Sequence, residues 1–150
     1  MTGDPAPHFC WRARVYWEDT DGGGVVYYAN YLRFLERART EWLRWRGFSQ
    51  ADLIKDPGII FVVANVSIDY LRPARLDDAL DITCDVEADG GVCMRFDQRV
   101  RRGDEVLARA SVRVACLDAQ SFRPKRLPAG IAQVIREAAP LDSSEGAPAT

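Results

Sequence analysis

Apolar and polar residues alternate in five stretches of the chain, and this two-residue period is typical of strands that bury one face. The stretches are residues 11–17, 64–70, 80–86, 91–100 and 106–116. Turn-forming sequences separate the last three stretches, ADGG at 88–91 and RRGDE at 101–105. Neighbouring strands joined by tight turns run antiparallel, so this part of the chain predicts an antiparallel meander.

One segment has the period of a helix instead. Between Tyr31 and Trp45, large apolar residues recur every three or four positions, arginines occupy the opposite face, and Gly47 follows as a stop signal. Glu36 and Glu41 on this helix are expected to pair with neighbouring arginines. A helix of about 16 residues that is apolar around most of its girth must be enclosed, and the strands are the only candidate cover. The pattern therefore predicts an α+β fold in which a sheet curls around one central helix.

The two ends of the chain differ from its middle. Residues 128–138 predict a short helix with Pro128 near its first turn. Residues 139–150 are small, polar and proline-containing, which predicts a disordered tail, and residues 1–8 form an N-terminal tail. We therefore expect a single domain over residues 9–138, without internal repeats.

Composition and charge narrow the classes of function. The chain has 150 residues, of which 47% are hydrophobic and 28% charged, as in an ordinary soluble globular protein. Its net charge of −2 gives no reason to expect binding to nucleic acid or to an anionic membrane surface. No apolar stretch approaches the roughly 20 residues that span a bilayer. The start, MTGDPAPHFCWR, is polar and interrupted by proline, so we expect no secretory signal and a cytoplasmic location.

The spacing of the cysteines predicts a structural role in packing, and no catalytic or metal-binding role. They are Cys10, Cys84, Cys93 and Cys116, they are widely spaced, and no two of them form a Cys-x-x-Cys pair. His8 is the one histidine of the sequence, so a zinc site has too few candidate ligands. We therefore expect buried or half-buried reduced thiols, and neither a metal site nor a catalytic thiol.

A glycine-rich segment joins the first strand to the helix. The strand is expected to end near Trp17, the helix to begin between Tyr28 and Asn30, and Gly22–Gly24 to fill the bend. Glycine permits positive φ and lets another backbone or a ligand approach closely. The start of a helix presents unpaired N–H groups and a partial positive charge, so this bend is a candidate site for a polar ligand.

Three acidic residues precede that helix start: Glu18, Asp19 and Asp21. A carboxylate beside the helix N–H groups would allow a carbonyl group to be polarised and attacked, which is the arrangement of acyl-transfer chemistry without serine or histidine. The alternative is a solvated acidic turn that happens to precede a helix. The spacing alone favours this alternative.

The segment RVYWEDTDGGGVVYYANYLRFLERARTEWLR, residues 14–44, resembles the signature of the hotdog-fold acyl-CoA thioesterases of the 4-hydroxybenzoyl-CoA thioesterase type. Within that group it is most similar to the branch associated with Tol–Pal genes, the YbgC-like branch. GFSQ, FVVANVSIDYLRPARLDDALDI and PKRLP fit the same branch, so the resemblance covers about residues 11–130. A motif of this length in a strand–loop–helix context favours the active-site interpretation over the solvated turn.

The resemblance implies a fold and an assembly. The hotdog fold is a long helix wrapped by an antiparallel sheet of about five to six strands. Its members form dimers whose sheets join edge to edge, often paired again into tetramers, with active sites at the dimer interface. The edge of an open sheet also needs a cover or a partner on general grounds. We therefore expect a homodimer or a homotetramer.

The resemblance also assigns the catalytic groups. The family's catalytic aspartate falls on Asp21, and in related enzymes it is either a nucleophile that forms a mixed anhydride or a general base for water. Tyr28 stands where the YbgC-like branch usually has histidine and the 4-hydroxybenzoyl-CoA enzymes have tyrosine. In that family the backbone N–H at this position polarises the thioester carbonyl, a role that does not depend on the side chain. Glu18 and Asp19 are expected to organise the loop. Another hotdog branch uses a helix glutamate as a catalyst, so a catalytic Glu36 is the alternative to its favoured pairing with arginine.

Five further residues are expected to contact the acyl part of the substrate or to shape its site. Gly24 and Val25 lie in the acidic loop. Asn30 either caps the helix, which is the favoured interpretation, or orients the loop. Phe61 and Val63, by their place in the second strand, are expected to line the acyl pocket from across the dimer.

Coenzyme A carries phosphate groups, so basic residues are expected outside the pocket mouth. Some relatives have lysine and arginine in the hairpin between the third and fourth strands, but here that hairpin is EADGG at 87–91, without a positive charge. Lys125 and Arg126 are the candidate substitutes, together with Arg72 and Arg75. The alternative, which charge alone favours, is that these side chains are solvated surface.

These inferences predict an acyl-CoA thioester hydrolase, which converts acyl-CoA and water to a carboxylate and free CoA without a metal or redox cofactor. The alternative is a non-catalytic hotdog module that binds acyl chains or acyl carrier protein. Asp21 argues against this alternative and the departure at Tyr28 argues for it. A dehydratase of the same fold is disfavoured because its histidine-bearing motif is absent. The acyl group, and whether CoA or acyl carrier protein carries it, are left open.

Overall fold

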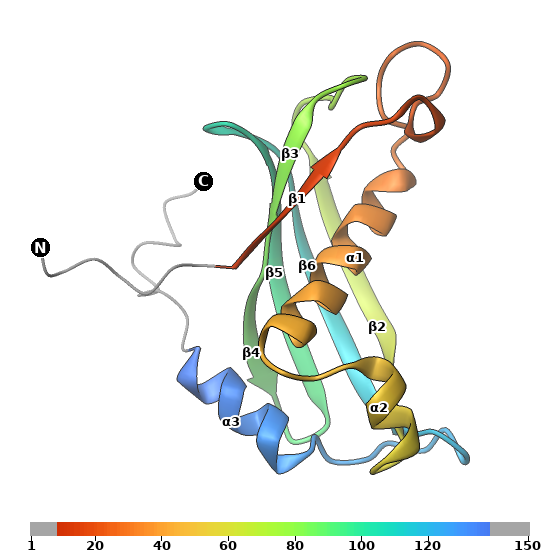
Figure 1. The fold of residues 1–150 in the computed structure, drawn as a ribbon, viewed down its shortest axis with the longest axis vertical. Coiled ribbons are helices and arrows are strands. Elements are labelled where there is room, and N and C mark those ends of the chain that lie inside the picture. Colours follow the sequence, from red (N-terminus) through yellow and green to blue (C-terminus); the bar gives the residue numbers. More distant parts are fainter. Residues whose placement is uncertain (1–8, 139–150) are drawn as a thin grey trace, which may run out of the picture.

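Six antiparallel strands form one sheet that curves around a long helix in residues 9–138, the part of the chain that the computed structural model describes (Figure 1). The strands are β1 (Cys10–Arg14), β2 (Ile59–Tyr70), β3 (Ala79–Thr83), β4 (Asp85–Asp89), β5 (Cys93–Arg102) and β6 (Glu105–Asp118). The helices are the 3₁₀ helix η1 (Trp17–Asp19), α1 (Asn30–Trp45), α2 (Gln50–Lys55) and α3 (Ala129–Glu137). The strand order is β1-β3-β5-β6-β2, with β4 also on β5. This architecture confirms the α+β fold; the expected tails, 1–8 and 139–150, lie outside the described residues.

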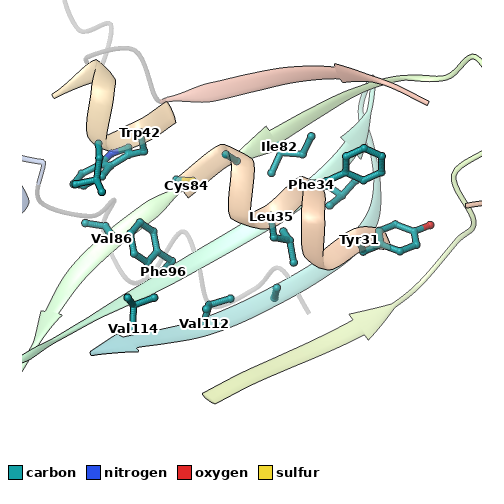
Figure 2. Packing of buried hydrophobic residues seen from close by; sticks show 14 of the residues in the cluster. Tyr31, Phe34, Leu35, Trp42, Ile82, Cys84, Val86, Phe96, Val112 and Val114 are labelled. Atoms are coloured by element: carbon teal, nitrogen blue, oxygen red, sulfur yellow. The ribbon is translucent and has the colours of Figure 1, made fainter. Parts of the chain in front are cut away.

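Helix α1 forms where the helical period predicts it, and it is the centre of the core. Its sheet-facing side chains are buried, and several of them are visible in Figure 2: Tyr31, Phe34, Leu35, Ala38, Trp42 and Leu43. The Trp42 ring meets the Phe96 ring of β5 edge to face, with centroids 5.8 Å apart. Burying one such side chain stabilises a fold by about 1.5–3 kcal/mol, so this face holds the helix against the sheet. The expected helix stop, Gly47, has φ of 96°, which glycine adopts without strain.

Strands β5 and β6 form the floor of the core. Their inward side chains are buried in alternation: Met94, Phe96, Gln98 and Val100 on β5, and Val112, Val114 and Cys116 on β6. The alternating stretch Leu80–Val86 is divided between β3 and β4. The register against β5 is nevertheless the same in both, with Ile82 opposite Val100 and Asp85 opposite Asp97. The predicted meander is therefore confirmed.

The structure departs from the sequence pattern at three places. Strand β1 ends at Arg14 and does not continue to Trp17, whose side chain is 64% exposed in η1. Cys10 is exposed, against the expectation of a buried or half-buried thiol, because β1 is an edge strand. Helix α2 has only six residues, too few to show a period. The Ser49 hydroxyl caps it by accepting a hydrogen bond from the Asp52 N–H at 3.1 Å.

Strand β2 has the period of a half-buried strand, but α1 does not cover it. Its inward positions lie opposite buried β6 residues, yet Val66 and Tyr70 are 40% and 46% exposed. Ala64, expected to face inward with them, instead falls at a bulge in the register between Val63 and Asn65. Within residues 9–138, β2 pairs with β6 alone, so its other edge presents unpaired backbone beside apolar side chains. An exposed edge of this kind tends to pair with a strand of another chain.

Candidate active site

The loop between η1 and α1 is a closed turn. A bridge between Thr20 and Val26 closes it, and the Asp21 N–H donates to the Val25 carbonyl at 3.0 Å. Gly22 and Gly24 have φ of 88° and 89°, a region in which a side chain would be strained. The glycines therefore allow the bend, as the sequence predicts, and they hold Asp21 at its tip.

The carboxylate of Asp21 is exposed but not free to rotate. Its Oδ1 accepts a hydrogen bond from the Gly23 N–H at 2.7 Å, which leaves Oδ2 available to water or to a substrate. A Cβ on Gly23 would lie 3.1 Å from the same Oδ1, so a larger residue there would press on the carboxylate and shift it. A short bond to a backbone donor fixes the carboxylate in one direction.

Asp19 organises the loop. Its Oδ2 accepts from the Tyr16 N–H at 2.8 Å, and its carbonyl accepts from the Tyr27 N–H at 3.1 Å. The same carbonyl accepts from Asn30 Nδ2 at 2.8 Å. Asn30 is the first residue of α1 and makes no capping bond, so the capping interpretation is wrong; its side chain ties the loop to the helix.

Tyr28 stands just before α1. Its carbonyl accepts from the Tyr31 N–H at 3.3 Å and from the Tyr70 hydroxyl at 3.2 Å. The N–H groups of Tyr28 and Ala29 have no acceptor in the described part of the chain. These two donors immediately precede α1, where they add to the partial positive charge of the helix start, and the Asp21 loop lies just before them in the chain. The sequence motif singles out only the first of them.

Tyrosine rings surround this helix start. The Tyr28 side chain is 61% exposed, and its ring centroid lies 4.9 Å from that of Tyr27 and 6.1 Å from that of Tyr70. The neighbouring Tyr28 hydroxyl raises the pKa of Tyr27, and partial burial raises the pKa of Tyr70. Both phenols are therefore protonated at neutral pH and act as hydrogen-bond donors.

A pocket of about 100 Å³ lies between the second half of α1 and the sheet. Its lining is Glu36, Arg39, Thr40, Leu43, Gln50, Phe61, Val63, Met94, Phe96 and Val114. Phe61 and Val63 are thus pocket residues, but Tyr28 contacts the far end of β2 at Tyr70. Tyr70 is nine positions along β2 from Phe61, about 30 Å away. One chain therefore does not bring the acidic loop and this pocket together.

The pattern that defines the Thioesterase superfamily matches residues 23–109. The chain belongs to this superfamily. It is 45% identical over 120 residues to an acyl-CoA thioesterase YbgC of Haemophilus influenzae, covering 80% of this chain and 88% of that protein. It is 42% identical over 130 residues to an acyl-CoA thioester hydrolase YbgC of Escherichia coli O6:H1, covering 86% and 96%.

Solved structures of other thioesterases have the same fold. A probable thioesterase from Bartonella henselae superposes with a TM-score of 0.77 at 37% identity, covering 81% of this chain and 100% of that one. A 1,4-dihydroxy-2-naphthoyl-CoA thioesterase from Synechocystis superposes with a TM-score of 0.81 at 25% identity, covering 87% and 97%. The resemblance to YbgC-like hotdog thioesterases is therefore confirmed.

In this member of the superfamily, the candidate phosphate-binding cations lie at both ends of β2. The Lys125 N–H donates to the carbonyl of Cys116, which is opposite Phe61, so Lys125 and Arg126 are at the pocket end. Lys125 Nζ donates to the Pro57 carbonyl at 3.1 Å and lies 3.7 Å from an Asp118 carboxylate oxygen, so its charge is partly neutralised.

Arg126 packs its guanidinium against the β4–β5 turn, 3.4 Å from where a Cβ on Gly91 would lie, and forms no ion pair within residues 9–138. Arg72 is paired with Glu105 at 3.3 Å. Arg75 is at the opposite end, where its backbone bridges Val25. Arg126 is therefore the best placed of the four to meet a phosphate near the pocket.

The other candidate chemistry of the chain is structural. Among the described residues, no three His, Cys, Asp or Glu side chains lie close enough to hold a metal ion. Cys84, Cys93 and Cys116 are buried and free, and burial raises the pKa of Cys84 and Cys116, which disfavours the reactive thiolate. None of the helices between residues 9 and 138 has both the length and the apolar character of a membrane span.

The helix glutamates behave differently from each other. Glu41 pairs with Arg44 at 2.6 Å, as expected. Glu36 instead accepts a hydrogen bond from the Thr40 hydroxyl at 2.9 Å, and it lines the pocket. The expected arginine pair of Glu36 is not formed in the described chain, so its carboxylate lines the pocket without a salt bridge.

Proposed function

We propose that this protein is an acyl-CoA thioester hydrolase in which Asp21 and the start of α1 carry the chemistry. The observation that carries the proposal is the pairing of an oriented carboxylate with unpaired N–H groups across one short loop. The relatives named acyl-CoA thioesterases cover most of the chain, which supports the same reaction. The products are a carboxylic acid and free CoA.

The geometry supports a simple division of labour. The thioester oxygen accepts hydrogen bonds from the N–H groups of Tyr28 and Ala29, which stabilise the negative charge that develops on it. In the general-base route, Asp21 takes a proton from water as the water oxygen attacks the carbonyl carbon, and the CoA thiolate then leaves and is protonated. In the nucleophilic route, Asp21 attacks first and water hydrolyses the mixed anhydride. A single turnover in ¹⁸O-water labels Asp21 only by the second route, when water attacks the Asp21 carbonyl carbon of the anhydride and the Asp21 oxygen leaves with the acyl group.

We also propose that the active site is shared between two chains. Two copies that pair along the free edge of β2, antiparallel and over the whole strand, set Ile59 of one opposite Tyr70 of the partner subunit. Asp21 and Tyr28 of each chain then lie beside Phe61 and Val63 of its partner. The pairing also covers the exposed apolar residues of β2 and gives hydrogen-bond partners to the backbone groups along its free edge.

The same arrangement accounts for the basic residues. Arg126 lies on the chain that contributes Phe61, with its guanidinium against Gly91 of the β4–β5 turn, and it is the cation that would meet a CoA phosphate on that side. A carrier other than CoA, such as acyl carrier protein, would present one phosphopantetheine phosphate to the same side. The tetramer that the resemblance implies would stack two such dimers without altering these contacts.

The experiment that tests the catalytic proposal compares Asp21→Asn with Tyr28→Phe. Asparagine keeps the shape of Asp21 and an oxygen that can accept from the Gly23 N–H, but removes the charge. We expect kcat to fall by about 10² or more, the usual contribution of a general base. Phenylalanine keeps the backbone N–H of Tyr28, so we expect a loss of about tenfold or less.

Both variants should be checked for folding by circular dichroism and assayed on a panel of short aliphatic, long aliphatic and aromatic CoA thioesters. An equal loss in Tyr28→Phe would assign proton transfer to the phenol. If neither substitution lowers turnover, Asp21 is not catalytic, and the alternative of a module that binds acyl chains takes precedence.

A further inference from the structure

The core contains one polar side chain that the catalytic proposal does not use. Gln98 of β5 is 1% exposed and is the buried polar residue of the described chain. Its Nε2 donates to the Leu35 carbonyl at 3.0 Å and to the Cys84 sulfur at 3.3 Å. Its Oε1 accepts from Arg39 Nη1 at 3.1 Å. A buried amide is tolerated because it is bonded, and these bonds fix the direction of its oxygen.

The partner of that oxygen is the Arg39 guanidinium, whose charged form Glu36 favours without forming an ion pair with it. Arg39 is half-buried on α1, and its guanidinium carbon lies 6.0 Å from the centre of the Phe96 ring. It forms no ion pair within residues 9–138, and burial lowers its pKa from the ordinary value. A guanidinium has five N–H donors, and Gln98 uses one of them. The remaining donors are free to meet a ligand in the pocket that Arg39 lines.

The lining of this pocket is divided by chemistry. One side is apolar, from Phe61 and Val63 on the edge strand to Met94 and Phe96 on the floor. The other side is polar and comes from α1 and α2. It consists of Arg39, Glu36, Thr40 and Gln50.

The polar side is an ordered chain of hydrogen bonds. Gln50 Nε2 donates to the Thr40 hydroxyl at 3.1 Å, and this hydroxyl donates to Glu36 Oε2 at 2.9 Å. Glu36 is close enough to Arg39 to oppose the loss of its charge. A ligand atom between them would meet a donor on one side and an acceptor on the other. A hydroxyl group satisfies both, whereas an alkyl end would cover the half-buried Arg39 without replacing its contacts with water.

We propose that this pocket binds the far end of the acyl group and that Arg39 selects acyl groups ending in a hydroxyl. The proposal rests on the proposed thioesterase function and on the shared site, which places the partner's Asp21 beside Phe61. Gln98 is a positioning residue that aims the guanidinium. A terminal carboxylate would also meet Arg39, but Glu36 would repel it.

The test uses two substrates that differ only at the far end, 6-hydroxyhexanoyl-CoA and heptanoyl-CoA, in which a methyl group replaces the hydroxyl. In the unmodified protein we expect kcat/KM for the hydroxyacyl substrate to be higher by about tenfold or more, since a site built to bind a hydroxyl discriminates against analogues that lack it. In Arg39→Met the ratio should fall to about one or reverse. Arg39→Lys should restore part of the preference, because it returns a cation.

Matched controls separate selection from folding. Arg44→Met, on the solvent side of the same helix, should keep the original ratio. The double variant Arg39→Met with Gln98→Leu removes both sides of the Arg39–Gln98 hydrogen bond, so no amide oxygen is left without its donor, while the Leu35 carbonyl and the Cys84 sulfur lose only the Gln98 N–H. This variant should fold while showing the same lost preference. Calorimetric binding of both thioesters to Asp21→Asn reports the preference without turnover.

The outcomes are distinct. Equal kcat/KM for the two substrates, or a ratio that Arg39→Met leaves unchanged, overturns the hydroxyl selection while the thioesterase function stands. A stronger preference for the CoA monothioester of hexanedioic acid would show that the pocket takes an anion and not a hydroxyl. If no thioester is hydrolysed, the thioesterase proposal fails; the calorimetric preference for the hydroxyacyl compound then still upholds or overturns the pocket's selectivity.

Discussion

Two inactive variants should restore activity to each other when they are mixed, if each active site takes residues from two chains. The first variant is Asp21→Asn, which damages the acidic loop. The second is Phe61→Lys, which replaces an apolar pocket residue with a cationic side chain. The long lysine side chain can extend its ammonium group to solvent, so the fold should tolerate it better than a buried carboxylate. Each variant alone should have about 1% of wild-type turnover or less.

The size of the recovery follows from the symmetry of the proposed dimer. Each dimer has two equivalent sites, and each site combines Asp21 of one chain with Phe61 of the partner subunit. In a mixed dimer one site receives both substitutions and the other receives neither. Random exchange of equal amounts makes about half of the dimers mixed, and half of their sites are intact, so the mixture should reach about a quarter of wild-type turnover. That is at least about 25-fold above either variant.

The assay is the initial rate of CoA release after subunit exchange, with the mixed dimer quantified by native mass spectrometry. Each variant mixed with itself is the control, and light scattering should show an assembly larger than the 16.8 kDa chain in every sample. Turnover that stays at background although mixed dimers have formed would refute the shared site. A fully active monomer would refute it as well.

Two further predictions follow from the ionisable side chains. A thiol reagent should modify only the exposed Cys10 in the folded protein, and slowly at neutral pH, because partial burial and Asp81 raise the pKa of this thiol. Replacing any one cysteine with serine should leave kcat within about threefold. A larger loss in a folded variant would assign a catalytic thiol. The backbone N–H groups of Ser121 and Gln120 lower the pKa of Asp118, so this carboxylate stabilises the fold at pH values above its unfolded pKa. The Tm of Asp118→Asn should therefore be clearly below that of the unmodified protein near pH 7, and the difference should shrink as the pH falls below about 4. A difference in Tm that does not depend on pH would contradict this reasoning.

The central helix and the meander are readable in the sequence because each has a strong period over many residues. Strand β2 is different. Its alternation is visible in the sequence, but the alternation does not predict its exposure, because nothing within residues 9–138 covers Val66 and Tyr70. Helix α2 escapes detection for a local reason, since six residues complete fewer than two turns.

The residues of the candidate site also differ in whether the sequence predicts them. Asp21 and Tyr28 are neighbours along the chain, so one motif contains the loop, the glycines and the helix start. Arg39 and Gln98 are 59 positions apart and meet only after β5 has packed against α1. In the sequence, Arg39 is one of several helix arginines, and nothing in the period separates it from the solvated face. Residues that meet across a core are found by structure, not by spacing.

Geometry explains why a chain of this size would divide its active site. Helix α1 is about 24 Å long and β2 about 40 Å, so the loop at the start of the helix and the pocket near Phe61 are at opposite ends of the molecule, as Figure 1 shows for the loop and α2. Within residues 9–138, two features lack a partner: the N–H groups of Tyr28 and Ala29, and the outer edge of β2 with its exposed apolar side chains. An antiparallel pairing of β2 covers the edge and, by the same rotation, carries the unpaired N–H groups to the pocket of the other chain. Assembly and catalysis would then depend on one strand, so a substitution that weakens the β2 edge should lower turnover in proportion to the dimer that it dissociates.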